Sequence, residues 1–508
     1  MISLLLSLAL YSPAPQSSPS NVLVIMADDL SIDVLNLYRP LCNQVGPTAI
    51  LLGGGGNPIN ASCTNPVAPL SPTATTPAID SLAATGIVFD RVWSNPTCSP
   101  TRATLQTGRY ASRTGIGKPL SIGTSDELQA CETTIAELLD GVYECGLFGK
   151  WHLGLTPCDP CCQHGWDRFR GHLHEVPGMQ LCSTWQQDVC DRASDCGETP
   201  TCGPNPETTY LLDKTFDDAK TWIGEQVTAQ SGPWLCYLWP QFPYDIFHEK
   251  TSTTCTACMS GNQTCYLQAL ENLDAQIASM ITFLSMQGEL ANTTIIFLGD
   301  NGTPGAGASN WPPGDDPFTA GQQTNYPHAK GTLYNGGVHV PMIVSGPGIG
   351  GDIVGTRSKA LINTTDLFAT IASIAGVTIP AGVAEDSVDF SPLFVGNSDL
   401  YAARPVIFAE EFNPNQVLAC GPVTPNCAVQ NNNDHSGAVR NGRFKLIRSR
   451  LNGACVEEFF DLNLDFAEQN DLLTPGGFGG LTAFQQTKYT ALATQLDAWV
   501  LPCGCGGD

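Results

Sequence analysis

The chain has 508 residues, enough for one large core and a smaller domain, and its hydrophobic content of 42% is typical of globular proteins. Acidic residues outnumber basic ones by 48 to 23, which gives a formal net charge of −25 at pH 7. A surface of this charge repels phosphate backbones and other polyanions, so the composition argues against nucleic-acid binding.

The amino terminus carries an apolar run, residues 2–10, that breaks at Pro13. The run is too short to span a bilayer and resembles the core of a signal peptide, although a disordered apolar terminus is the alternative. The chain also has 21 cysteines, a density typical of oxidising compartments. We therefore predict a signal peptide over residues 1–19, a secreted or lumenal (lysosomal or extracellular) protein, and no membrane span.

Continuous apolar runs, which predict strands buried between helices, alternate along the chain with helical patterns. The strands are expected at 21–27, 146–148, 235–238, 294–299 and 340–345, and the helices at 78–84, 133–139, 215–226, 267–285 and 365–374. This alternation predicts an α/β fold with a mainly parallel central sheet sandwiched by helices.

Beyond residue 392 the pattern changes to short strand-like pieces, at 406–410 and 444–447, and a final helix near 488–499. We expect a smaller C-terminal α+β domain there. The predicted organisation is thus an N-terminal catalytic domain over 20–392 and a C-terminal subdomain over 393–508.

Two long segments, 53–72 and 158–206, show neither helical nor strand patterns and are predicted to be functional or separately braced loops. The second contains Cys158, Cys161 and Cys162, for which a zinc cluster and disulfides compete. Because the spacing is not a paired Cys-x-x-Cys, we predict disulfides.

Other features fit a secreted glycoprotein. Four Asn-x-Ser/Thr sequons are present, at Asn60, Asn262, Asn292 and Asn363. Cys145 and Cys236 lie in apolar runs and could instead be buried thiols.

Acidic side chains follow two of the predicted strands. Asp28 and Asp29 come after the first, and Asp300 with Asn301 after 294–299. Sites in α/β folds gather at the carboxyl ends of strands, and hard cations such as Ca²⁺ and Mg²⁺ prefer oxygen ligands. The four residues are therefore a candidate metal site, whereas Asp28 and Asp29 alone could simply cap a helix.

The most specific motif is Cys98-Ser-Pro-Thr-Arg102, followed by Thr107-Gly-Arg109. A lone cysteine is often a core thiol or half of a disulfide. This longer string, however, resembles the modification signature of the formylglycine-dependent (type I) sulfatases, arylsulfatase-like members of the alkaline phosphatase superfamily. The resemblance implies that a formylglycine-generating enzyme oxidises Cys98 to 3-oxoalanine during maturation.

Further segments resemble that family in its own order. They are the acidic pair at 28–29, the Gly-Lys-Trp-His-Leu-Gly string at 149–154, the Gly-Asp-Asn-Gly string at 299–302, and the stretches 330–341, 363–368, 438–447 and 460–470. The resemblance covers about residues 21 to 475. Taken singly, Lys150 and Lys330 could be solvated surface charges and His152 a core histidine.

The resemblance implies a sulfuric ester hydrolase acting on aryl or carbohydrate sulfates. One hydroxyl of the hydrated Cys98 aldehyde attacks sulfur, while Asp28, Asp29, Asp300 and Asn301, joined by the modified Cys98, bind one cation, with Ca²⁺ favoured over Mg²⁺. The basic residues, Arg102, Lys150 and Lys330, stabilise the sulfuryl charge, and His152 takes a proton from the second hydroxyl.

The sequence departs from the family at positions around the site. Tyr244 stands where the family usually has the histidine that helps to protonate the leaving group, and His248 or His328 could replace it. Asn335 and His339 replace an expected Glu and Arg, which alters the support of the site.

Two alternative functions stay open. One is a phosphoesterase or phosphonate hydrolase of the same superfamily, and the other is a catalytically silent, secreted glycan-binding homologue, motivated by the missing histidine. The acidic surface favours small or singly sulfated substrates over long polysulfated chains.

Overall fold

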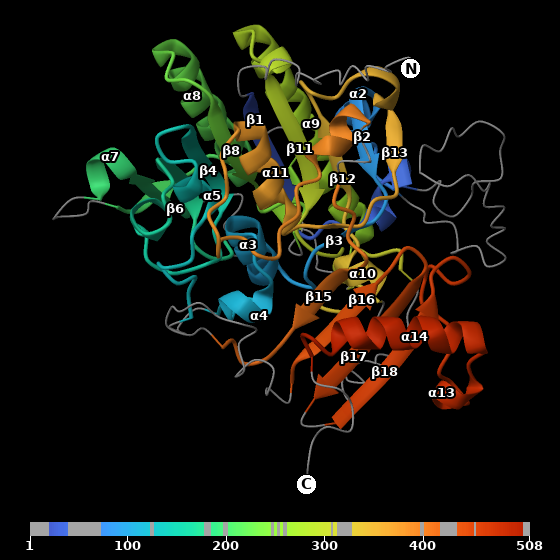
Figure 1. Ribbon diagram of the computed structural model, residues 1–508. Helices are drawn as coiled ribbons and strands as arrows, with labels where there is room; N and C mark the ends of the chain where they lie inside the picture. Colours follow the sequence, from blue (N-terminus) through green and yellow to red (C-terminus); the bar gives the residue numbers. More distant parts are fainter. Residues whose placement is uncertain are drawn as a thin grey trace, which may run out of the picture.

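A computed structural model describes residues 20–38, 73–121, 126–176, 184–196, 202–244, 248–250, 255–257, 262–305, 308–311, 328–396, 401–416, 434–451 and 454–500, with only the backbone for 248–250 and 255–257. The predicted signal peptide and the segment 53–72 lie outside these residues. Within the described part, a ten-stranded sheet is flanked by helices, and a four-stranded sheet lies beside it (Figure 1).

The large sheet has a parallel centre, and antiparallel pairs join further strands to it on both sides. Its strands, in spatial order, are β13 (Thr356–Ser358), β2 (Gly86–Phe89), β12 (Met342–Ser345), β11 (Thr293–Gly299), β1 (Asn21–Ala27), β8 (Trp234–Trp239), β4 (Glu144–Lys150), β5 (Arg168–His172), β6 (Trp185–Asp191) and β7 (Gly203–Glu207). The five strands from β11 to β5 run parallel, and this confirms the predicted fold class.

The strand predicted at 340–345 exists as β12, but it does not join the parallel set. Strand β12 pairs antiparallel with both β11 and β2. A strand covered on both faces is continuously apolar whichever way it runs, so its composition carries no direction. The segment 158–206 was also not a plain loop, because it contains β5, β6 and most of β7, the last three strands at one end of the sheet. Their many polar residues hid them from a search for apolar runs.

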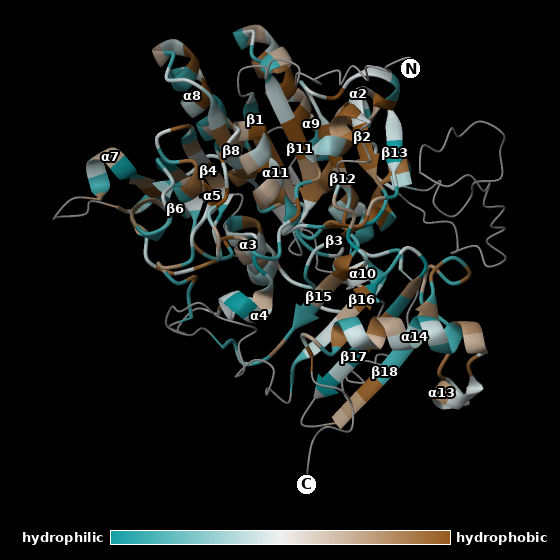
Figure 2. Ribbon diagram, viewed as in Figure 1, coloured by the Kyte–Doolittle hydropathy of each residue, from teal (hydrophilic) through white to brown (hydrophobic). Residues whose placement is uncertain are grey.

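Two helical layers cover the sheet, and alternate residues of β1 point into them. Leu23 and Ile25 pack in one apolar cluster with the long helices α8 and α9, whereas Val22 and Val24 pack in the other, with residues of α3 and α11. Figure 2 shows the apolar residues concentrated in the central strands between these layers. The core therefore fixes the strand ends rigidly.

The helices have the following bounds: α2 (Pro77–Thr85), α3 (Cys98–Thr107), α4 (Ala111–Thr114), α5 (Ile135–Leu138), α6 (Asp159–Cys162), α7 (Arg192–Asp195), α8 (Leu211–Ala229), α9 (Gln263–Gln287), α10 (Asn335–Val338), α11 (Asp366–Ala375) and α13 (Gly477–Gly480). Two small sheets have two strands each: β3 (Val92–Trp93) pairs with β14 (Ile362–Asn363), and β9 (His248–Lys250) pairs with β10 (Cys255–Ala257). All five helices predicted before residue 392 exist. No helix of the described residues is long and apolar enough to cross a membrane.

The C-terminal sheet is antiparallel, in the order β15 (Ile407–Glu411), β16 (Ser436–Arg440), β17 (Phe444–Leu451) and β18 (Ala454–Asp461), and is covered by α14 (Ala483–Leu496). Apolar side chains of α14 pack on the sheet, and a second cluster joins the sheet to α10. This agrees with the predicted α+β architecture, while the boundary at residue 392 stays a prediction.

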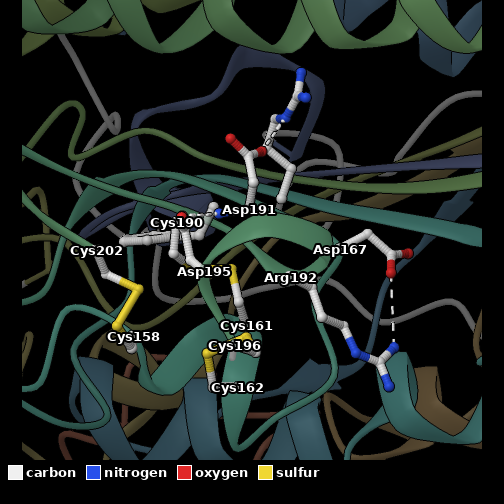
Figure 3. Close-up of a disulfide and its surroundings, with 12 residues drawn as sticks. Cys158, Cys161, Cys162, Asp167, Cys190, Asp191, Arg192, Asp195, Cys196 and Cys202 are labelled. Carbon is white, nitrogen blue, oxygen red and sulfur yellow. Dashed lines mark hydrogen bonds and ion pairs between the residues drawn. A yellow bond between two sulfur atoms is a disulfide. The ribbon is translucent and has the colours of Figure 1, made fainter. Parts of the chain in front are cut away.

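Six cysteines in the described part of 158–206 form disulfides. Cys158 bonds to Cys202, Cys161 to Cys190 and Cys162 to Cys196, tying α6 to strand β6 and to the segments around α7 and β7 (Figure 3). These bonds consume the thiols that a zinc cluster needs, so the predicted disulfides are confirmed for these three pairs. Outside them, Cys145 and Cys236 are buried free thiols, as their apolar surroundings suggested.

One predicted glycosylation sequon is contradicted. Asn363 is 3% exposed, and its side-chain amide donates to the carbonyl of Phe408, so no glycan fits there in the folded chain. Asn262 and Asn292 are exposed, and Asn60 lies outside the described residues.

Candidate active site

The four predicted metal ligands meet at the carboxyl ends of β1 and β11. The two strands pair in parallel with Ala27 opposite Gly299, so the residues that follow them are neighbours. Asp28, Asp29 and Asp300 are fully buried and each offers an oxygen within 4.8 Å of the others. Asn301 Nδ2 donates to Asp29 Oδ1 at 2.8 Å. Their positions directly after two apolar strands were enough to predict that these side chains lie together.

Asp29 has a backbone conformation that the surroundings impose. Its φ is 69°, in the left-handed region, and it is held there from both sides. Its N–H donates to Asp300 Oδ1 at 2.8 Å, and its carbonyl accepts from the Tyr266 hydroxyl at 2.7 Å. Such strain at a cluster of charged groups is typical of functional sites.

Three basic side chains contact the acidic cluster. Lys150 Nζ, at the end of β4, lies 2.9 Å from Asp28 Oδ2. Arg102 Nη2, from α3, lies 2.8 Å from an oxygen of Asp300, and Lys330 Nζ lies 2.7 Å from both oxygens of Asp29. Buried charges of opposite sign neutralise each other here, as they must away from water.

The oxygen atoms of the cluster include two with no partner. Asp28 Oδ1 and Asn301 Oδ1 are buried and accept no hydrogen bond. Buried acceptors are nearly always paired, so two unpaired oxygens beside two more carboxylates fit the ligand set of a cation. Carboxylate and amide oxygens suit Ca²⁺ or Mg²⁺ rather than a soft metal.

The carboxyl pKa values diverge within this cluster. Burial raises the pKa of Asp29 to about 6, against the lowering effect of Lys330, and raises that of Asp300 to about 7 with help from Asp28. Burial opposes ionisation of Asp28 too, but Lys150 and Arg102 hold its pKa below the ordinary value. The metal-free cluster therefore retains protons near neutral pH, and a cation has to displace them.

Cys98 begins helix α3 and is a free, fully buried thiol. Its Sγ lies 3.2 Å from His152 Nδ1, and the neighbouring Ser99 hydroxyl donates to the His152 carbonyl at 2.9 Å. Burial raises the pKa of the Cys98 thiol to about 11, so the unmodified side chain is protonated and a weak nucleophile.

His152 is oriented toward Cys98 by a backbone carbonyl. Its Nε2 lies 3.1 Å from the carbonyl oxygen of Leu120, which can only accept, so Nε2 carries the proton. Nδ1 is then the free acceptor, facing Cys98. Burial and the charge of Lys150 lower the pKa of His152 to about 3, which keeps the ring neutral. The sequence predicted the residue but not this tautomer.

Tyr244 lies in the site, as its alignment with the family histidine suggested. Its N–H donates to the Asp28 carbonyl at 3.2 Å. The ammonium groups of Lys150 and Lys330 lie over its ring, 4.8 and 5.1 Å from the centroid. Its hydroxyl donates to the carboxylate of Glu175. A phenol thus takes the place of an imidazole beside the two lysines.

Sequence reasoning missed Glu175. It follows β5, and its Oε1 lies 3.3 Å from Lys150 Nζ and 4.0 Å from Cys98 Sγ. Burial opposes its ionisation, but the charge of Lys150 holds its pKa well below the ordinary value. Glu175 lies in a polar segment outside the motifs that resemble the family, so no sequence pattern marked it as a site residue. Only the pairing of β5 with β4 brings it beside Cys98.

The two histidines offered as replacements for Tyr244 have different outcomes. His248 lies on β9, and its side chain is not among those described. The ring of His328 stacks on Tyr334, with the ring centroids 3.5 Å apart. His328 therefore packs against the residue that precedes α10.

Asn335 and His339 support the site from behind. The Asn335 amide donates to the Phe466 carbonyl at 3.0 Å, and a ring nitrogen of His339 lies 2.9 Å from the Asp90 carbonyl. Both side chains are buried, and both bonds anchor the helix α10 that follows Lys330.

The strand ends of this α/β sheet bring together a buried acidic cluster, three basic side chains and a candidate nucleophile. This combination is typical of hydrolases that act on charged esters. A family model described as Sulfatase matches residues 20–377, and the chain belongs to this family. It is a sulfuric ester hydrolase.

Relatives of this chain include named sulfatases. Arylsulfatase A of Bos taurus is 27% identical over 433 residues, covering 81% of this chain and 74% of that protein. Arylsulfatase A of Homo sapiens is 28% identical over 412 residues, covering 77% and 71%. N-acetylgalactosamine-6-sulfatase of Canis lupus familiaris is 26% identical over 428 residues, covering 80% and 71%.

Solved structures share the fold. A crystal structure of Ps i-CgsB in complex with k-i-k-neocarrahexaose has a TM-score of 0.67 at 19% identity and covers 96% of each chain. BT4656 in complex with its substrate D-glucosamine-2-N,6-O-disulfate has a TM-score of 0.63 at 16% identity, covering 94% of this chain and 97% of that one. At these identities the likeness concerns the fold.

Proposed function

We propose that this chain cleaves aryl or carbohydrate sulfate esters with an oxidised Cys98 as nucleophile, beside a divalent cation. One observation carries the proposal: the free Cys98 Sγ faces the acceptor nitrogen of His152 and stands next to the acidic cluster with its unpaired oxygens. A cysteine with a purely structural role would not need to lie among charged side chains and beside a strained backbone.

Asp28, Asp29, Asp300 and Asn301 would hold the cation, and the modified Cys98 would complete the site. Bound Ca²⁺, for which Mg²⁺ is the alternative, supplies positive charge against the sulfate oxygens and the attacking hydroxyl. The oxygen-only donor set and its two unpaired atoms support this assignment.

The oxidised and hydrated form of Cys98 supplies two hydroxyls on one carbon: one attacks sulfur and displaces the alcohol, and deprotonation of the other expels sulfate and restores the aldehyde. His152 accepts that proton, because Leu120 fixes the tautomer that leaves Nδ1 free. A serine or thiol in this place has no second hydroxyl and depends on attack by water.

Arg102, Lys150 and Lys330 act as fixed positive charges on the sulfuryl group. Arg102 and Lys150 are fully buried and Lys330 is 20% exposed, so their field is poorly screened. Pairing with the acids, and a hydrogen bond from Arg102 to the Lys150 carbonyl at 2.8 Å, hold them in position before substrate binds. This preorganisation lowers the cost of stabilising the transition state.

The protein is proposed to be secreted or lumenal, with residues 1–19 as its signal peptide. The disulfides of 158–206 support an oxidising compartment. Because Cys98 is 0% exposed in the fold, we expect a formylglycine-generating enzyme to act before the chain has folded.

The proposed activity is tested by comparing hydrolysis of p-nitrophenyl sulfate and p-nitrophenyl phosphate at matched concentrations. We expect the sulfate ester to be cleaved faster, because the site is a single acidic cluster with a modifiable cysteine. Dominant turnover of the phosphate ester would contradict the proposal and favour a phosphoesterase.

Tyr244 predicts a dependence on the leaving group. Its hydroxyl donates to Glu175 and is a weaker acid than an imidazolium, so departure of an alkoxide receives little help, whereas a phenolate needs little. We expect Tyr244→His to raise the kcat/KM ratio of an alkyl sulfate to p-nitrophenyl sulfate by about tenfold or more. The matched control is Tyr244→Phe, which supplies no acid. An equal rise in both variants would contradict a role for proton donation.

A further inference from the structure

Among the described residues of the site, Glu175 is the acidic group that reaches solvent. Its side chain is 37% exposed, whereas those of Asp28 and Lys150 are 0% exposed. Its carboxylate nevertheless reaches to 4.0 Å from Cys98 Sγ and 3.3 Å from Lys150 Nζ. A negative charge therefore stands between bulk water and the nucleophile, and the other partly exposed charge of the site, within the described residues, is the ammonium group of Lys330, 20% exposed.

The position of this carboxylate is fixed rather than mobile. Lys150 Nζ contacts it at 3.3 Å, and the Tyr244 hydroxyl donates a hydrogen bond to it. Tyr244 is itself held by its bond to the Asp28 carbonyl and by the two ammonium groups over its ring. Glu175 thus presents its charge at a defined place.

A sulfate ester must pass this charge. Its sulfate belongs among Arg102 and Lys150, which are fully buried, and Lys330, which is 20% exposed, so the alcohol portion extends toward solvent past Glu175. A second anionic group close to the ester is then repelled by Glu175, and a cationic group is attracted. The net charge of −25 adds a repulsion that salt screens, whereas a charge within a few ångströms acts on bound substrate.

We propose that Glu175 selects singly sulfated esters that carry no second anion near the sulfate, and favours those that carry an amine there. This inference rests on the proposed function and adds the substrate class. It also gives a physical role to a carboxylate in a site built to bind an anion.

The test uses three phenyl sulfates that differ only at the end of a two-carbon arm: an amine, a hydroxyl or a carboxylate. The arm insulates the ring, so the three phenols are similar leaving groups. We expect wild-type kcat/KM to favour the amine over the carboxylate ester by about tenfold, a figure that allows for solvent screening at Glu175. In Glu175→Gln, which keeps an acceptor for Tyr244, the ratio should fall to between one and three.

Glu289→Gln is the matched control. Glu289 accepts from Asn21, at the opposite end of β1 from Asp28, and its replacement changes the net charge by the same amount. The control should keep the wild-type ratio. An equal loss in both variants would assign the preference to the overall charge and overturn the proposal.

A purely structural role also has its own signature. If Glu175 only anchors Lys150, Glu175→Gln lowers kcat/KM for all three esters equally and leaves their ratio unchanged, which would overturn the inference. If wild type cleaves none of the three esters, nor p-nitrophenyl sulfate, the proposed function itself fails and the inference falls with it.

Discussion

Cys98→Ala is expected to lower kcat/KM for p-nitrophenyl sulfate by at least about 10⁴-fold, because it removes the nucleophile and leaves only binding and electrostatics. The matched control is Cys236→Ala. Cys236 is also a free and fully buried thiol, but it lies within β8 among apolar residues. Its loss should affect stability and leave turnover intact. An equal loss of activity in both variants would show that the effect comes from removing a buried thiol, and would contradict a role of Cys98 as nucleophile.

Cys98→Ser distinguishes the two-hydroxyl chemistry from ordinary nucleophilic attack. A serine can take the sulfuryl group from the ester and release the phenol once, but it lacks the second hydroxyl that expels sulfate. We expect at most one phenol per protein molecule and a stable added sulfuryl group in the intact-protein mass spectrum. Steady turnover by this variant, or an unmodified Cys98 thiol in fully active enzyme, would contradict the mechanism.

The acidic cluster was predictable because parallel strands end at one edge of a sheet. Asp28 and Asp300 are far apart in sequence, yet each follows a strongly apolar strand, and pairing of those strands in register brings them together. Lys150 and His152 were identified only through the resemblance of 149–154, at the end of β4, to the family's motif. In these places local pattern and topology agree, and no knowledge of loops is required.

Glu175 and β12 show where sequence reasoning failed. Glu175 reaches Cys98 because β5 pairs with β4. That pairing belongs to a polar segment braced by disulfides. The spacing of cysteines in a sequence does not reveal which of them are bonded. The direction of β12 depends on the route of the chain between β11 and β12, not on its apolar composition. The burial of Asn363 likewise arises from a long-range contact with β15.

Removal of divalent cations is expected to abolish turnover and to lower the free energy of unfolding. The cation binds the folded cluster and not the unfolded chain, so a hundredfold excess of Ca²⁺ over its Kd should stabilise the protein by about 3 kcal/mol. Thermal unfolding with and without a chelator measures this without an assay of activity. Absence of any Ca²⁺ or Mg²⁺ effect would contradict a cation at this site.

The stabilisation by Ca²⁺ should grow with pH. Asp29 and Asp300 have pKa values raised to about 6 and about 7 by burial, so at pH 5 the metal-free cluster holds protons that the cation must displace. At pH 8 these protons are already gone. The Ca²⁺-induced shift in unfolding temperature is therefore expected to be larger at pH 8 than at pH 5, and the reverse order would contradict binding by these carboxylates.

Asp28→Asn should remove the response to Ca²⁺ and lower kcat/KM by about 10²- to 10³-fold, since the substitution deletes a ligand charge and leaves Lys150 and Arg102 short of a partner. The matched control is Asp33→Asn. Asp33 is another fully buried carboxylate near β1, but it accepts hydrogen bonds from Thr303 and the backbone of Asn310 and contacts none of the three cations. Its replacement should destabilise the fold while retaining the Ca²⁺-induced shift. Because both variants lose one buried negative charge, a shift that survives in Asp33→Asn and disappears in Asp28→Asn locates the cation at the strand ends.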